Sequence, residues 1–110
     1  MPYGIPQEVL REIKARDVDC VYCRKPMTPT TKPFRADNAT IEHLNHLPTH
    51  QFSYPKTAEF FAMACRRCNC NLRRDKPLAV WVAEQGIADT VAPVVKTYLQ
   101  RPQASWAIAV

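Results

Sequence analysis

Hydrophobic positions along the chain fall into short segments with either a helical or a strand-like spacing. Apolar residues recur on one helix face over Ile5–Arg16, which predicts an amphipathic helix with Pro6 in its first turn. Two runs of apolar and β-branched residues, Thr40–Leu44 and Phe60–Ala64, predict short strands. This mixture of helices and strands predicts an α+β fold.

Two further helices are predicted after the second strand. The first begins around Arg66–Asn69 and runs for a few turns toward Asp75. Pro77 suits the first position of the second helix, Leu78–Gln85, and Gly86 suits its end, because glycine readily adopts the left-handed conformation that stops a helix.

The remaining pattern predicts one last helix and two loops. Asp89 or Thr90 is a suitable cap for a helix that runs to about Gln100. Prolines punctuate Arg24–Ala39, which is predicted to be a loop with at most one short extended piece. Asn45–Lys56 also contains prolines and is predicted to be a long loop, and long loops in small domains are often functional.

The composition is that of one globular domain over residues 1–110. The chain is 46% hydrophobic and 23% charged, and no apolar run is long enough to span a membrane. Its first residues lack a signal-peptide pattern, so we expect a cytoplasmic location, where disulfides are disfavoured. The five cysteines are therefore interpreted first as candidate metal ligands.

Two cysteine pairs share one spacing, Cys20-Val-Tyr-Cys23 and Cys65-Arg-Arg-Cys68. Two residues between cysteines let a tight turn direct both sulfurs at one ion, and two such turns complete a tetrahedron around structural zinc. The 41 residues between the pairs leave room for a β-hairpin. Cys70 does not fit the spacing and is predicted to be a free thiol.

The net charge of +5 favours an anionic partner, with nucleic acid as the first expectation. Bound zinc modifies this figure. Four thiolates add −4 and the ion adds +2, which lowers +5 to +3. The position of the basic residues is therefore more informative than their number.

Chemistry-bearing residues gather in and after the segment between the pairs. Glu42 and His43 are adjacent at the end of the first predicted strand, and Asn69 follows the last zinc cysteine. A hairpin and a helix that share one zinc site would bring His43 and Asn69 close together. Carboxylate and amide oxygens suit a hard metal ion, and a neutral histidine beside it can deprotonate water.

The combined motif resembles the HNH endonuclease family. It consists of Cys20-x-x-Cys23, Thr40-Ile41-Glu42-His43-Leu44 and Ala62-Met63-Ala64-Cys65-Arg66-Arg67-Cys68-Asn69. The likeness covers roughly Asp17–Arg74. It implies a ββα-metal, treble-clef-like core at about residues 17–76, in which a β-hairpin and a helix surround the zinc. An N-terminal helix and a C-terminal helical extension at about 77–101 flank this core.

The resemblance also implies roles for individual residues. His43 matches the general base that activates water against the scissile phosphate, and Glu42 and Asn69 match the ligands of a catalytic Mg²⁺ or other divalent cation. The expected substrate is DNA, with double-stranded DNA favoured. Basic residues near the last cysteine would contact phosphates without reading sequence: Arg66, Arg67, Arg73 and Arg74.

The chain also departs from the family pattern. Phe60 stands where members commonly carry an asparagine that orients the base, Leu72 stands where a basic residue is usual, and the glycine pair of the hairpin loop is absent. Either the site is altered or a loop residue replaces the missing asparagine. The candidates in this loop are Asn45, His46 and His50.

Two other functions remain open. The first is a zinc-stapled nucleic-acid-binding module without catalytic activity, which would need the cysteines and arginines but not the Glu42-His43 pair. The second is a protein-interaction domain that uses the apolar C-terminal helices and the tail around Trp106. Trp81 and Tyr98 have apolar neighbours at helical spacing and are predicted to be core residues.

Overall fold

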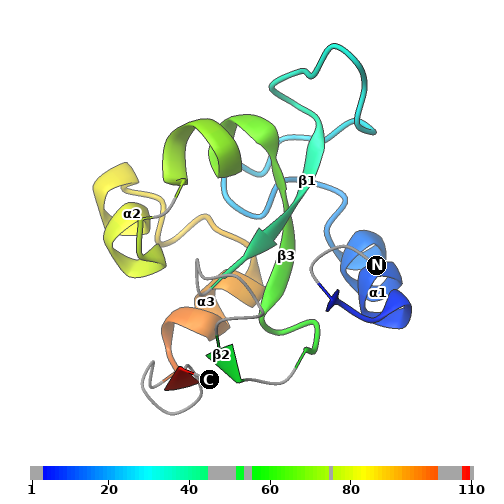
Figure 1. Cartoon of the computed structure of the whole chain (residues 1–110). Coiled ribbons are helices and arrows are strands. Elements are labelled where there is room, and N and C mark those ends of the chain that lie inside the picture. The colour runs from blue at the N-terminus through cyan, green and yellow to red at the C-terminus, as the bar shows by residue number, and fades with distance from the viewer. Residues whose placement is uncertain (1–3, 45–51, 54–55, 75, 102–107, 110) are drawn as a thin grey trace.

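The computed structural model describes residues 4–44, 52–53, 56–74, 76–101 and 108–109. These residues form an antiparallel β-hairpin with helices around it, so the α+β class is confirmed. Helix α1 (Gln7–Arg16) lies on one side of the hairpin, and α2 (Leu78–Gln85) and α3 (Pro93–Leu99) lie on the other (Figure 1). None of the described helices is long and apolar enough to cross a membrane.

The hairpin consists of β1 (Ala39–His43) and β3 (Phe61–Cys65), each displaced by one residue from its predicted range. All five residues of β3 are buried, which explains its continuous apolar sequence. Ala39 lies opposite Cys65, and His43 lies opposite Phe61. Cys65 and His43 therefore belong to opposite ends of the hairpin.

Helix α1 is confirmed, and polar contacts at its C-terminal end attach it to the hairpin. The Arg16 guanidinium donates to the carbonyl oxygens of Ala58 and Phe61, at 2.8 Å each. The buried Asp17 carboxylate accepts the backbone N–H of Met63 at 3.0 Å. The bonds to Phe61 and Met63 satisfy backbone groups of β3, and the bond to Ala58 holds the segment just before this strand. Pro6 is the N-cap residue, so it lies just before the first turn rather than within it as the sequence predicted.

The helix after the second strand is present, but it is a π-helix, η3 (Arg67–Arg73). The Arg74 N–H donates to the Asn69 carbonyl five residues earlier, at 3.0 Å. Such widened turns shift the side chains that follow relative to an α-helix, and they are frequent at functional sites. In this turn Arg73 is fully buried while Arg74 is exposed.

Helix α2 ends as the sequence predicted, because Gly86 adopts the left-handed conformation with φ of 65°. Trp81 and Tyr98 are buried core residues, as predicted. The Trp81 ring packs edge-on against Tyr22, with 4.9 Å between the ring centroids. This contact joins α2 to the segment that carries the first cysteine pair.

The predicted start of the last helix is wrong. Helix α3 begins at Pro93 with Ala92 as its N-cap, and neither Asp89 nor Thr90 caps it. The Thr90 hydroxyl donates to the Ile87 carbonyl within the preceding turn. The Ala92 N–H donates to the Val21 carbonyl at 2.8 Å, so a tertiary contact sets where the helix begins.

A second, two-stranded pairing lies outside the hairpin. Strand β2 (Phe52–Ser53) pairs antiparallel with β4 (Ile108–Ala109), which connects the predicted long loop to the C-terminal tail. The sequence predicted no strand in this loop. Asn45–Gln51 of the loop and Trp106 of the tail lie outside the described residues.

One buried asparagine organises the proline-rich loop before β1. The Asn38 Oδ1 accepts from the N–H of Arg35 at 2.8 Å and from Thr31, and its Nδ2 donates to the Thr28 hydroxyl and the Pro29 carbonyl at 3.1 Å each. Asn38 is only 1% exposed. The loop therefore has a defined shape without a regular element of its own, and this role of Asn38 was not predicted.

Asn38→Ala is expected to lower the free energy of unfolding by about 2–3 kcal/mol, because it leaves several loop donors and acceptors unsatisfied at a buried position. Denaturant unfolding of the zinc-loaded protein measures this change. Asn71→Ala is the matched control, since Asn71 is exposed on η3 and should change stability by less than about 0.5 kcal/mol. Equal effects of the two variants would contradict the structural role of Asn38.

Candidate functional site

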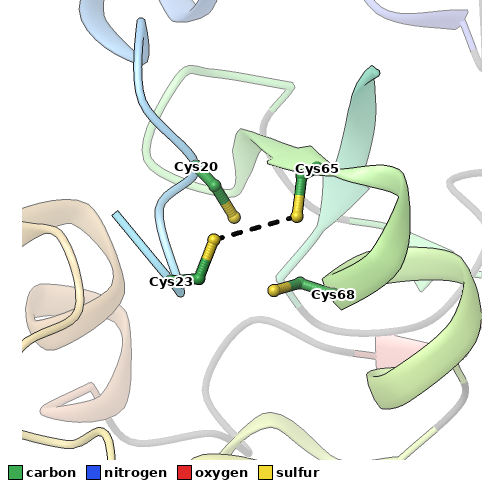
Figure 2. A group of neighbouring side chains, drawn as sticks. All are labelled: Cys20, Cys23, Cys65 and Cys68. Atoms are coloured by element: carbon green, nitrogen blue, oxygen red, sulfur yellow. Dashed lines mark hydrogen bonds between the residues drawn. The ribbon is translucent and has the colours of Figure 1, made fainter. Parts of the chain in front are cut away.

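The four predicted cysteines form one cluster. Figure 2 shows the thiols of Cys20, Cys23, Cys65 and Cys68 directed toward a common centre, and their sulfurs all lie within 4.8 Å of one another. The Cys23 and Cys65 sulfurs are 3.9 Å apart. Tetrahedral zinc, with bonds of about 2.3 Å, holds sulfurs about 3.8 Å apart. The cluster is thus positioned to hold a metal ion, and its all-thiol donor set fits structural zinc.

Local hydrogen bonds form the first cysteine turn. The Tyr22 N–H donates to the Cys20 sulfur at 3.4 Å, and the Arg24 N–H donates to the Cys20 carbonyl at 2.9 Å. Arg24 has a positive φ of 64°, which reverses the chain, and the Cys20 N–H donates to the Lys25 carbonyl at 2.9 Å. These hydrogen bonds hold Cys20 and Cys23 in one turn, with both sulfurs directed into the cluster.

The second pair comes from regular structure. Cys65 is the last residue of β3, and Cys68 lies in the first turn of η3. An ion held by both pairs would join the first turn, the hairpin and the helix at one point. Cys70 is exposed and is not part of the cluster, in agreement with the prediction of a free thiol.

The thiols share protons unequally. A hydrogen bond from the Cys68 thiol lowers the pKa of Cys20 to about 4, against the effect of burial. Burial raises the pKa of Cys65 to about 11, and donation to Cys20 raises the pKa of Cys68. Hydrogen bonds thus join the thiols of the cluster to one another. A metal ion would replace these protons and bind all four sulfurs as thiolates.

Glu42 lies in a buried cluster of polar side chains, defined here as the Tyr22–Glu42–Arg73 cluster. One carboxylate oxygen is 3.1 Å from the Arg73 Nη1, and the other accepts the Tyr22 hydroxyl at 2.9 Å. Glu42 is 4% exposed, and burial raises the pKa of its carboxyl while the charge of Arg73 opposes the change. Both oxygens are thus occupied by protein groups, which differs from the expected role as a metal ligand.

The prediction that Arg73 contacts phosphates is wrong for this arrangement. Its guanidinium is fully buried and donates to the carbonyl oxygens of His43 and Leu44 at 2.9 Å each. The Nε also donates to the Lys76 carbonyl at 3.1 Å. Arg73 therefore holds the end of β1 against the C-terminal end of η3. Nothing in the sequence distinguishes it from its arginine neighbours.

His43 ends β1 beside this cluster. Its ring packs edge-on against Phe61, with 5.4 Å between the ring centroids. Burial lowers the pKa of the imidazole, and the positive charge of Arg73 lowers it further. His43 is therefore neutral at pH 7, the form that can accept a proton.

Asn69 lies against the same strand. Its Nδ2 donates to the Thr40 hydroxyl at 2.9 Å and to the Ile41 carbonyl at 3.1 Å. The helix that follows the zinc cysteines is thereby joined to the strand that carries the Glu42-His43 pair. These contacts bring together the two sequence segments whose proximity we predicted.

The other predicted site residues lie in different surroundings. Arg67 and Arg74 are exposed, and Arg66 is half-buried against the Phe34 ring. Phe60, at the position of the family's asparagine, is buried in the core at 2% exposure. Three of the loop candidates lie outside the described residues: Asn45, His46 and His50. Among the residues described, the cysteine cluster is the one grouping of three or more typical metal ligands.

Comparison with known proteins adds no assignment. No family model matches the chain, and neither a curated protein nor a solved structure matches it.

Proposed function

We propose that this chain is an HNH-type endonuclease with a ββα-metal, treble-clef-like core, in which His43 is the general base for hydrolysis of DNA phosphodiester bonds. The contact between Asn69 and β1 is the main support. Asn69 directly follows the last zinc cysteine, and its hydrogen bonds reach Thr40 and Ile41, next to the Glu42-His43 pair. This association of hairpin, helix and cysteine cluster is what the family resemblance implies.

The protonation state of His43 suits the proposed role of general base. Its lowered pKa keeps the imidazole neutral, so it can take a proton from a water that attacks the phosphorus. Its packing against Phe61 restricts the ring. Two exposed arginines, Arg67 at the start of η3 and Arg74 just after its end, would hold neighbouring phosphates.

The catalytic divalent cation has less support than the zinc. A bound Mg²⁺ would stabilise charge on the phosphate and on the leaving oxygen. Glu42 does not fit as its ligand in the contacts described above, since Arg73 and Tyr22 occupy both carboxylate oxygens. The proposed reaction is therefore derived from His43, and its dependence on a divalent cation is a matter for measurement.

A second candidate function follows from the same contacts. If Arg73 holds Glu42 permanently, the chain would be a zinc-stapled module that binds nucleic acid without cleaving it. Because the Arg73 guanidinium lies against Glu42 where the family resemblance implies a metal cation, the Glu42–Arg73 ion pair favours this alternative. This second function predicts that the protein binds DNA but does not cleave it with any divalent cation.

Cleavage of supercoiled plasmid separates the two functions. Wild-type protein is expected to nick or linearise the plasmid with Mg²⁺, Mn²⁺ or Ni²⁺, and His43→Ala is expected to lower the rate about 100- to 10,000-fold through loss of the general base. Rates are followed by gel electrophoresis, with and without each cation.

Two controls accompany the plasmid assay. The His43→Ala protein must retain its zinc and its circular dichroism spectrum, so that loss of rate is not loss of fold. Asn71→Ala serves as an exposed η3 variant that should cleave like the wild type. Undiminished cleavage by His43→Ala would overturn the nuclease proposal, and binding without cleavage by the wild type would establish the second function.

A further inference from the structure

The positive charge of the chain is concentrated in one region. The loop before β1 and the start of η3 carry six basic residues and one acidic residue: Arg24, Lys25, Lys32, Arg35, Arg66, Arg67 and Asp37. This excess equals the whole net charge of +5, so basic and acidic residues balance in the rest of the chain. The region is therefore the natural place for contact with a polyanion.

An exposed aromatic ring lies within this basic region. Phe34 is 52% exposed and does not belong to the hydrophobic core. The Arg66 guanidinium carbon lies 4.2 Å from the centroid of its ring, in a cation–π stack. Single exposed apolar residues are common and need no explanation. A ring stacked on an arginine inside a cationic surface, however, matches the way single-stranded nucleic acids are bound.

The ring is held in place by its surroundings. The hydrogen bonds of Asn38 fix the loop, including the Arg35 N–H that follows Phe34. Two backbone bonds then attach the loop to the start of the helix, from Arg66 N–H to the Asn38 carbonyl at 2.8 Å and from Arg67 N–H to the Ala36 carbonyl at 2.9 Å. Little conformational entropy would be lost when such a preorganised surface binds a ligand.

The loop lies at the end of the hairpin opposite His43. It leads into Ala39, the first residue of β1, and it projects beyond the hairpin in Figure 1. The five residues of β1 span about 13 Å at about 3.3 Å per residue. The loop that carries the ring is therefore separated from His43 by the length of this strand.

We infer that Phe34, backed by Arg66, is a stacking platform for an unpaired base of a DNA strand, with Lys32, Arg35 and Arg67 on the adjacent phosphates. The inference rests on the proposed function, in which DNA is the substrate. It adds a contact, away from the scissile phosphate, that favours unpaired over paired bases. A base must leave the duplex to stack on the ring, so the platform favours single-stranded or frayed DNA over intact duplex.

Binding is measured separately from cleavage. The zinc-loaded His43→Ala protein is titrated, without added divalent cation, into a fluorescein-labelled oligothymidine of about twelve nucleotides, and anisotropy is recorded over a range of salt concentrations. Adding Phe34→Ala to this protein is expected to weaken binding roughly fivefold or more, which is the contribution of one stacked base. Val80→Ala is the matched control, because Val80 is a similarly exposed apolar residue on α2.

Three further measurements distinguish stacking from charge and from misfolding. Phe34→Trp is expected to restore the affinity, because indole stacks on bases at least as well as phenyl. Phe34→Ala should leave the salt dependence unchanged, whereas Lys32→Gln and Arg35→Gln should each reduce the slope by about 0.7. Replacing the bases by abasic sites should abolish the difference in affinity between the protein that retains Phe34 and the Phe34→Ala variant.

Several outcomes would overturn the inference. They are equal affinities of the Phe34→Ala and Val80→Ala proteins, an undiminished Phe34 effect on the abasic strand, or tighter binding to intact duplex than to the single strand. Absence of cleavage of both plasmid and single-stranded DNA by the wild type, combined with the expected binding pattern, would reject the nuclease and leave the platform standing.

Discussion

Cys65→Ser is expected to abolish zinc binding and to unfold most of the chain. Cys65 ends β3, and its sulfur lies 3.9 Å from that of Cys23, so the ion would join the first cysteine turn to the hairpin and to η3. Structural zinc contributes about 10–16 kcal/mol of binding free energy in small domains, whereas a whole domain is stable by about 5–15 kcal/mol. The stabilisation lost with the ion is therefore comparable to the entire stability of the chain.

The chain provides its own control for this experiment. Cys70→Ser makes the same chemical change five residues later, at an exposed thiol outside the cluster. It should keep one zinc per chain and the wild-type melting temperature. Zinc content is measured by elemental analysis after dialysis, and folding by circular dichroism during heating.

Two results would contradict the assignment of the metal centre. One is a Cys65→Ser protein that retains a full equivalent of zinc and the wild-type melting temperature. The other is loss of zinc from Cys70→Ser, which would place Cys70 among the ligands. A graded chelator titration of the wild type should show loss of helix content in step with loss of zinc.

Arg73→Met is expected to lower the free energy of unfolding by about 3–5 kcal/mol, because it leaves the Glu42 carboxylate buried without its counter-charge. It also removes the donors to the His43 and Leu44 carbonyl oxygens. Arg73 opposes the effect of burial on the Glu42 pKa, so its removal should raise that pKa further. Denaturant unfolding at pH 7 measures the change.

A matched control and a rescue make this prediction specific. Arg74→Met changes the neighbouring, exposed arginine and should alter stability by less than about 0.5 kcal/mol. Glu42→Gln in the Arg73→Met background removes the unpaired charge and should recover part of the loss. Equal stabilities of the Arg73→Met and Arg74→Met proteins would show that the buried ion pair is not formed.

The Arg73→Met variant also bears on catalysis. If Glu42 must leave Arg73 to take part in the reaction, Arg73→Met would gain dependence on divalent cation while losing stability. If the Tyr22–Glu42–Arg73 cluster is purely structural, cleavage by Arg73→Met would fall only in proportion to the folded fraction. The plasmid assay and the unfolding curve together separate these outcomes.

Several elements were predictable because their causes are local. The periodicity of Gln7–Arg16 and the glycine at position 86 act within a few residues, and the corresponding helices were confirmed. The repeated Cys-x-x-Cys spacing likewise determines a tight turn with both sulfurs on one side. The grouping of all four thiols followed from matching two such turns to one tetrahedral ion.

The burial of individual polar residues was not predictable in this way. Arg73 and Arg74 are neighbours of the same type, and only the π-helical turn decides which of them faces inward. Asn38 is an ordinary loop residue in the sequence, yet five hydrogen bonds converge on it. The burial of these polar residues depends on partner groups that are distant in the chain and become neighbours only after folding.

By itself the sequence determined the grouping of the four cysteines, the hairpin and the helices around it, and it carries the motif that resembles the nuclease family. These features depend on the spacing of residue types along the chain and on the conformations that short stretches of sequence favour, and both can be recognised in one sequence. Only the tertiary structure decided that Glu42 pairs with Arg73, that α3 starts from a contact with Val21, and that Phe34 is stacked on Arg66. Each of these is a contact between distant segments, whose partners are selected by packing and by the need to satisfy buried polar groups.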